Sequence, residues 1–270
     1  PGGIGAALGL RNSKDNISLI DEKEQIGGQY YKQISNIFKI QSLNSLDRQT
    51  KEAIKLEKKI RESNHNILLG VKVWGVYRVE KNRYEICCYN ENQDLRIISK
   101  KIIIATGSYE KPYFVEGWQL PNVITTGAAQ IFSKSQKIFP GENVLICGNG
   151  PLNFQLADEL KKNKVNVLAI TESADSPFFS IASSFICALT SPIIFFKGLK
   201  NYLSIFFSKT IIYHQTALEK ITAEGEKKKI FVKNLRQNLT KTINEIDVVC
   251  INYGFTPNND IGKIFGLDGF

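Results

Sequence analysis

One stretch decides the fold of this 270-residue chain: Gly141-Glu-Asn-Val-Leu-Ile-Cys-Gly148-Asn149-Gly150-Pro151-Leu152-Asn153. Residues 144–147 are a short apolar run, which is typical of a buried strand. A Gly-x-Gly turn interrupts that run, and Pro151 follows where a helix would begin. Proline suits the first helical turn because its missing N–H would have no intrahelical partner there. The stretch therefore predicts a strand, a tight turn and a helix that continues through residues 154–160.

This arrangement predicts a nucleotide site. A strand, a glycine turn and a helix N-terminus bring backbone N–H groups and the positive helix end to one point, which attracts a pyrophosphate. A second apolar run, 165–170, leads to Glu172, about twenty residues further on. An acid there accepts the ribose hydroxyls of an adenine dinucleotide and repels a 2′-phosphate, which favours NAD over NADP. The predicted NAD-binding residues are Gly148, Asn149, Gly150, Pro151, Leu152, Asn153 and Glu172.

A similar pattern of glycines, helix, strand and acid appears at the start of the chain. Pro1-Gly2-Gly3 opens an Ala-rich stretch, and a later apolar run ends at Asp21-Glu22 with the same glycine-to-acid spacing. Compared with the later copy, this one lacks its opening strand and its first two glycines. We therefore expect the chain to begin inside a dinucleotide fingerprint and to be a fragment. The absence of methionine agrees, and a merely flexible Pro-Gly-Gly start leaves the following helix and acid unexplained.

Composition limits the classes of function. The chain is long enough for one large or two ordinary domains, and 43% of its residues are hydrophobic. The net charge of +9 invites a nucleic-acid interpretation, but the lysines are scattered and form no basic stripe interleaved with stacking aromatics. A lysine-rich solvated surface is the better account, so we expect no nucleic-acid partner.

The cysteines and histidines show no metal-ligand spacing. The five cysteines fall mostly in apolar, strand-like runs, and the two histidines stand alone. Buried thiols in a reducing compartment fit this pattern, which favours a cytoplasmic protein without a bound metal. No signal peptide is visible in the sequence.

The rest of the chain alternates between helical and strand-like patterns. A charged amphipathic helix is predicted over 47–63, and another short helix over 127–137. A small antiparallel layer is predicted to feed a central parallel strand, 101–104, which runs into Ala105-Thr106-Gly107. The remaining strands are predicted at 66–69, 71–79, 83–89, 95–99, 210–214, 218–222, 229–233, 239–244 and 247–251.

The stretch from residue 176 to 207 stands apart. Residues 176–196 carry no charge, which is long enough to consider a membrane span. Pro177, Pro192 and several serines oppose a span, as does a position between two strands of a nucleotide domain. We expect helices packed against a partner subunit, with peripheral membrane contact as the next interpretation.

The motifs together resemble a known family, the two-dinucleotide-binding-domain flavoproteins (the pyridine nucleotide–disulfide oxidoreductase superfamily). Within it, the chain resembles the flavin/nicotinamide subunits of hydrogen cyanide synthase, opine oxidase, proline and hydroxyproline dehydrogenases and sarcosine oxidase alpha. The stretches that carry the resemblance are Asp21-Glu22 with Gly27-Gly28-Gln29, Val73-Trp74-Gly75-Val76, Ala105-Thr106-Gly107-Ser108-Tyr109-Glu110, Gly117-Trp118-x-Leu120-Pro121 and Gly148-Asn-Gly150-Pro151-Leu152.

The resemblance implies an α/β fold of two Rossmann-like, three-layer ββα domains, truncated at both ends, with the second inserted in the first. The expected FAD-binding domain comprises residues 1–116 and the return segment 254–270, and the expected NAD(P)-binding domain comprises 117–253. A connector at 111–122, rich in proline and glycine, marks the first boundary.

The resemblance also implies the FAD-binding residues. Pro1, Gly2 and Gly3 would hold the FAD pyrophosphate, with Asp21 or Glu22 on the adenosine ribose. Gly28 and Gln29 would lie toward the flavin. The backbone near Val73 would meet the adenine, and Ala105-Thr106-Gly107 would pass under the cofactor. In the second domain, Gly254 would close over the NAD.

Redox cysteines in disulfide reductases of this fold follow the paired glycines or form Cys-x-x-Cys. Here Tyr30-Tyr31 follows Gln29, and Cys87-Cys88 is adjacent rather than spaced. We therefore expect hydride or electron transfer through the bound cofactors, and no catalytic acid or base is identified. The resemblance implies an electron-relaying subunit in a hetero-oligomer whose partner oxidises an amino-acid-type substrate. The alternatives are a stand-alone NAD(P)H:acceptor flavin reductase and a non-catalytic nucleotide-binding subunit.

Overall fold

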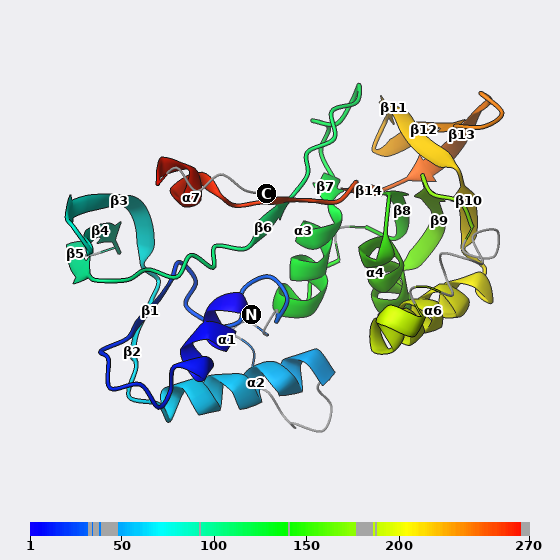
Figure 1. Ribbon diagram of the computed structural model, residues 1–270. Helices are drawn as coiled ribbons and strands as arrows, with labels where there is room; N and C mark the ends of the chain where they lie inside the picture. The colour runs from blue at the N-terminus through cyan, green and yellow to red at the C-terminus, as the bar shows by residue number, and fades with distance from the viewer. Residues whose placement is uncertain are drawn as a thin grey trace. The chain divides into compact units, whose positions relative to one another are not determined.

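The computed structural model describes residues 1–31, 34, 38, 48–91, 93–139, 141–176, 186 and 188–265 (Figure 1). It contains two compact units. The first comprises Pro1–Tyr109 and Pro257–Phe270, and the second comprises Glu110–Thr256. The second unit is thus an insertion in the sequence of the first. The sequence patterns instead predict the boundaries of the inserted domain at residues 117 and 254.

A five-stranded parallel sheet forms the centre of the second unit, with the strand order β10-β9-β8-β14-β7. Every residue of β14 is buried, and β8 is buried from its second residue onward. Strands covered on both faces require continuous apolar runs rather than alternation, which is why these two were recognisable in the sequence. The strands are β7 (Val123–Thr125), β8 (Asn143–Gly148), β9 (Asn166–Glu172), β10 (Ile211–His214) and β14 (Val248–Asn252).

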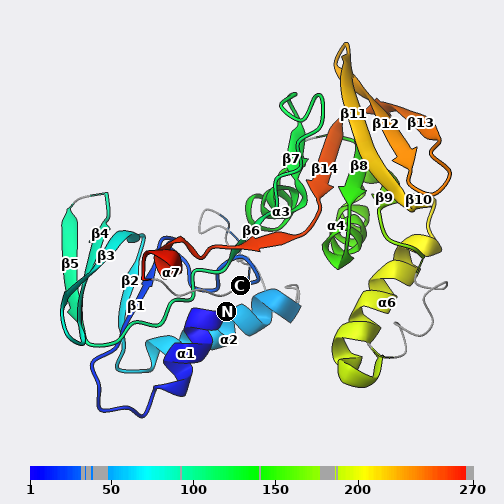
Figure 2. The same ribbon diagram turned by 45° about the horizontal axis from the view of Figure 1, so that its top comes forward.

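Two further layers cover this sheet (Figures 1 and 2). Successive residues of β8 point to opposite faces, so Ile146 joins the core under the helices and Leu145 the core under the antiparallel strands. The helical face carries α3 (Thr126–Gln130), the π-helical η2 (Ile131–Gln136), α4 (Pro151–Lys162) and α6 (Pro192–Phe206). The opposite face carries the antiparallel strands β11 (Thr216–Glu224), β12 (Lys227–Asn234) and β13 (Thr240–Ile246). This confirms the predicted three-layer ββα, Rossmann-like fold.

The first unit is smaller and has two cores. Ile4 and Ala7 of α1 pack with Ile60 of α2 beside the parallel pair β1-β2. Val76 and Cys88 anchor the antiparallel sheet β3-β4-β5. The elements are α1 (Gly2–Gly9), β1 (Ser18–Asp21), α2 (Arg48–Arg61), β2 (Asn66–Leu69), β3 (Lys72–Glu80), β4 (Arg83–Tyr89), β5 (Asp94–Ser99) and α7 (Asp260–Ile264).

One predicted strand is wrong. Residues 101–107 carry no strand, although the apolar run at 101–104 predicted a central parallel one. A strand requires a neighbour for its ladder of hydrogen bonds, and no described segment forms such a ladder with residues 101–104. Ile103 is accordingly 62% exposed. Instead, β6 (Ser108–Glu110) and β15 (Phe255–Pro257) form a two-stranded sheet.

No helix in the described part of the chain combines the length and the apolar character that crossing a membrane requires.

Candidate functional site

The second glycine turn joins a central strand to the helix that follows it. Gly148 ends β8 with a φ of +149°, and a Cβ at this position would lie 1.7 Å from the carbonyl oxygen of Asn252. Only glycine fits so close an approach of two backbones. The Asn149 N–H donates to the same carbonyl at 2.8 Å, and Pro151 begins α4 after Gly150. The turn therefore contacts the carboxyl end of β14 directly.

Glu172 closes onto this turn. Its strand pairs with β8 so that Glu172 lies opposite Gly148. Its carboxylate accepts the Gly150 N–H at 3.0 Å and the Ala174 N–H at 3.2 Å, and the side chain is buried. Burial raises the pKa of Glu172, although these backbone hydrogen bonds act in the opposite direction. One backbone donor of the glycine turn is thus occupied by the chain's own acid.

Asn153 occupies the position where a small residue usually stands in this fingerprint. Its side chain is fully buried. Its Oδ1 accepts the Thr126 hydroxyl at 3.0 Å, and its Nδ2 donates to the Asn252 carbonyl at 3.4 Å. Asn153 therefore links α4 to the start of α3 and to the end of β14.

Two residues that support the turn were not predicted as site residues: Glu110 and Asn252. The Glu110 carboxylate accepts the Gly127 N–H, at 2.8 Å to Oε1 and 2.9 Å to Oε2, where α3 begins. Asn252 donates to Glu110 at 2.7 Å and accepts the Gly254 N–H at 3.1 Å. A polar residue at the carboxyl end of a core strand was the available signal, because ligands bind at that edge. Gly254, with a φ of +107°, is held by this contact.

The start of α1 brings several predicted residues of the first unit together. A Cβ added at Gly2 or Gly3 would lie 3.7 or 3.8 Å from the Ala105 Cβ, and one added at Gly28 would lie 3.4 Å from the Pro1 ring. The helix α1 begins at Gly2, and no side chain caps it. A helix N-terminus without a cap presents unsatisfied N–H groups. Small residues from separate segments of the first unit thus meet at the start of α1.

The acid positions of the first unit differ in exposure. Asp21 ends β1 and is half-buried, with its Oδ1 accepting the Lys23 N–H at 3.0 Å. Glu22 is exposed, as is Gln29. Val73 lies in β3 and packs in the cluster that includes Ile20, beside Asp21. The side chain of Asp21 is therefore less exposed than that of Glu22.

The segment after Ala105 forms hydrogen bonds with the part of the chain that re-enters the first unit at Pro257. The Thr106 hydroxyl donates to the Asn258 carbonyl, and the Asn258 N–H donates to the Gly107 carbonyl at 2.9 Å. Asn258 belongs to the Gly-Phe-x-Pro-Asn sequence that follows the last core strand. These two hydrogen bonds connect Thr106 and Gly107 to Asn258 within the first unit.

The described cysteines are free and buried: Cys87, Cys88, Cys147 and Cys250. Burial raises the pKa of Cys88, and it raises that of Cys147 to about 12. These two thiols are therefore protonated at neutral pH, and the thiolate is the reactive form. Cys187 lies outside the described residues.

A three-layer α/β unit with a glycine turn, inserted in the sequence of a second unit with a glycine-rich helix and a parallel strand pair, is typical of proteins with two dinucleotide-binding folds. The chain belongs to the pyridine nucleotide-disulphide oxidoreductase family, whose sequence profile matches residues 1–268. This confirms the family inferred from the sequence motifs.

Among characterised relatives, an opine oxidase subunit from Agrobacterium tumefaciens is 30% identical over 188 residues, which cover 66% of this chain and 36% of that subunit. Hydrogen cyanide synthase subunit HcnB from Pseudomonas protegens is 24% identical over 99% of this chain and 57% of its own length. The chain thus spans from about a third to just over half of these relatives.

Solved structures support the same fold. L-proline dehydrogenase from P. horikoshii superposes with a TM-score of 0.64 at 17% identity, covering all of this chain and 43% of its own. Thioredoxin reductase from Lactococcus lactis gives a TM-score of 0.69 at 16% identity, covering 98% of this chain and 78% of its own. At these identities, the likeness concerns the fold alone.

Proposed function

We propose that this chain is part of an FAD- and NAD(P)-dependent oxidoreductase, and that it relays electrons within an enzyme that oxidises an amino acid, opine or amine. The observation that carries the proposal is the repeated combination of a helix that starts at proline and glycine residues and an acid that ends the next strand, once in each unit. Relatives named as subunits of opine oxidase and hydrogen cyanide synthase support this substrate class.

In this proposal, the first unit holds FAD. The start of α1 at Pro1-Gly2-Gly3 fits a pyrophosphate because a helix N-terminus attracts anions and this one lies beside small residues. Asp21 is the preferred acceptor for the adenosine ribose, with Glu22 as the alternative. Gly28 and Gln29 would lie toward the flavin.

The other first-unit residues have supporting roles. The backbone near Val73 would contact the adenine, and Ala105-Thr106-Gly107 would pass under the cofactor. When bound, the flavin supplies the two-electron chemistry, and the protein orients it and excludes competing reactions.

The second unit is proposed to hold the nicotinamide dinucleotide on the turn Gly148–Asn153, with Gly254 beside it. The Leu152 N–H lies in the first turn of α4, where it has no intrahelical acceptor. Glu172 fits a ribose only after it leaves the Gly150 N–H, and its charge would disfavour a 2′-phosphate. The proposed nucleotide is therefore NAD rather than NADP.

The proposed transfer passes directly between the cofactors without a redox disulfide. The burial of the described cysteines supports this, because a dithiol relay needs accessible thiolates. A partner flavoprotein subunit that oxidises the substrate would donate the electrons, which makes the assembly a hetero-oligomer. The cysteine usage supports a cytoplasmic location.

One observation favours a second candidate function, a nucleotide-binding subunit without its own catalysis. The contact between Glu172 and Gly150 satisfies a donor that a bound dinucleotide would otherwise use. A subunit whose second site stays closed would bind flavin and leave catalysis to its partner.

Flavin analysis and an anaerobic NADH titration of the full-length protein test the proposal. We expect bound FAD whose yellow absorbance bleaches when NADH is added. An Asp21→Ala variant should lose FAD, whereas Glu22→Ala should keep it. Bound FAD that no nicotinamide reduces would favour the second candidate, and the absence of flavin from the wild-type protein would overturn the proposal.

A further inference from the structure

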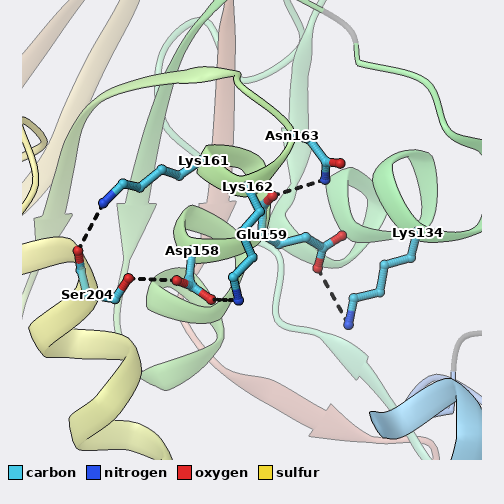
Figure 3. Close-up of polar contacts among 7 residues, drawn as sticks. All are labelled: Lys134, Asp158, Glu159, Lys161, Lys162, Asn163 and Ser204. Carbon is cyan, nitrogen blue, oxygen red and sulfur yellow. Dashed lines mark hydrogen bonds and ion pairs between the residues drawn. The ribbon is translucent and has the colours of Figure 1, made fainter. Parts of the chain in front are cut away.

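Helix α6 is held to its unit by a buried face and by polar contacts with α4. Tyr202 and Ile205 are buried in the core beneath the helices. The Ser204 hydroxyl donates to Asp158 at 2.7 Å, and the Lys161 ammonium donates to the Ser204 carbonyl at 3.2 Å (Figure 3). The burial of Tyr202 and Ile205 fixes which face of α6 points away from the core.

The face of α6 away from Tyr202 is apolar and exposed. Ile193 is 80% exposed, Phe196 64% and Phe207 80%. With a helical repeat of 3.6 residues, residues 193, 196, 200 and 207 share one side. We define the α6 surface as the apolar residues of this side together with the exposed apolar residues just before the helix: Ile186, Leu189, Ile193, Phe196 and Phe207. Large apolar side chains gathered in this way mark an interaction site.

The charged side chains of α6 and of the segments next to it in the sequence are of one sign. Lys197 and Lys200 lie on the exposed part of α6, and Lys209 follows the helix. Residues 176–218 contain no aspartate or glutamate. The surface is therefore complementary to an anionic partner.

The combination of exposed apolar side chains and lysines favours a lipid surface over a protein partner. Lysine is depleted at protein–protein interfaces. A helix with exposed Phe and Leu-type residues and lysines is typical of helices that lie in the plane of a membrane. The lysine stems can lie along the apolar layer while their ammonium groups reach lipid phosphates. With 15 residues, α6 is about 22 Å long, which suits a helix lying on a bilayer rather than crossing it.

We propose that the α6 surface docks on an anionic phospholipid bilayer. The apolar side chains enter the boundary between headgroups and acyl chains, and the lysines contact the phosphates. This inference is independent of the nucleotide sites, because it involves none of their residues.

Vesicle flotation of the full-length protein tests the inference. We expect the protein to float with vesicles of phosphatidylcholine and phosphatidylglycerol and not with vesicles of phosphatidylcholine alone. Raising the salt concentration should release it, because salt screens the lysines. A Phe196→Ser, Phe207→Ser double variant should bind at least about tenfold more weakly, since two exposed phenylalanines lose their burial in lipid.

Two matched controls separate the α6 surface from general effects. Phe114 is 69% exposed in the same unit, so Phe114→Ser should leave vesicle binding unchanged. A Lys197→Glu, Lys200→Glu variant should lose binding, whereas Lys55→Glu with Lys59→Glu makes the same change in net charge on α2 and should retain most of it. Unchanged circular dichroism and melting temperature would show that each variant is folded.

Three outcomes would overturn the inference. The wild-type protein does not float with anionic vesicles, or the phenylalanine pair and Phe114 behave alike. The third is a stable complex with a protein partner or a second copy that depends on Phe196 and Phe207, without vesicle binding. That result would assign the surface to a protein interface instead.

Discussion

The two units each have a helix start followed by an acid at the end of a strand, and the acids differ in what they contact. In the first unit, α1 starts without a side-chain cap, and Asp21 is half-buried at the end of its strand. In the second, Glu172 accepts the Gly150 N–H, and Asn149 donates to the end of β14. The spacing therefore predicts the backbone arrangement, but it does not predict whether the donors are available to a ligand.

The difference has a local physical cause. Glu172 lies opposite Gly148 on the neighbouring strand, and its side chain is long enough to turn back onto Gly150. Asp21 is one methylene shorter and instead accepts the N–H of Lys23, two residues further along. The Glu172 carboxylate therefore contacts the neighbouring turn, whereas the Asp21 carboxylate contacts the backbone just after its own strand.

The largest expected effect comes from the close approach at Gly148. Gly148→Ala should lower the free energy of unfolding by at least about 3 kcal/mol, because its Cβ would collide with the Asn252 carbonyl. The matched variant is Gly150→Ala, where a Cβ meets nothing within 4 Å and only the positive φ is unfavourable. It should cost about 1–2 kcal/mol. Urea unfolding of both variants measures this, and equal losses would contradict the geometry of the second turn.

The next largest loss of stability is expected for a substitution at Asn153. Asn153→Ala should destabilise the protein by about 2 kcal/mol, because it leaves the buried Thr126 hydroxyl without its acceptor and opens a space beneath α4. Asn163, at the other end of the helix, makes an exposed hydrogen bond to the Glu159 carbonyl. Asn163→Ala should cost no more than about 0.5 kcal/mol. Thermal melts of the two variants provide the comparison, and similar shifts would show that the Asn153 contacts contribute little.

Glu172 makes the closed turn sensitive to pH. Because its folded-state pKa is raised, the stability it contributes is present at acidic pH and is lost as the pH rises above the ordinary glutamate range. Glu172→Gln removes this titration, so its stability relative to the wild type should improve between pH 4 and pH 7. Denaturant unfolding at several pH values measures the difference. A difference that is constant over this range would show that the carboxylate is not held in a desolvated position.

The acids at the end of β1 should show the smallest energetic effect on folding. Asp21→Ala removes a single partly exposed hydrogen bond to the Lys23 N–H and should lower stability by about 0.5–1 kcal/mol. Glu22→Ala, at an exposed position, should be close to neutral. Melting temperatures without added FAD distinguish these cases, and a loss at Asp21 as large as that at Gly148 would mean that the first turn is as tightly packed as the second.

Much of this structure was predictable from the sequence because the signals were local. The apolar run of β8, the glycines and Pro151 specify strand, turn and helix within a few residues. The strand expected at 101–104 failed because strand formation depends on a neighbour, which a local pattern does not contain. The orientation of Glu172 and the contact between Glu110 and Asn252 were also out of reach, since each joins residues distant in the sequence.

The most direct test is a crystal structure of the full-length protein with bound NAD. The account predicts that the Glu172 carboxylate leaves the Gly150 N–H and accepts the ribose hydroxyls, while the pyrophosphate lies at the start of α4. A dinucleotide bound at Gly148–Asn153 with Glu172 still on Gly150 would contradict the claim that this acid closes the turn.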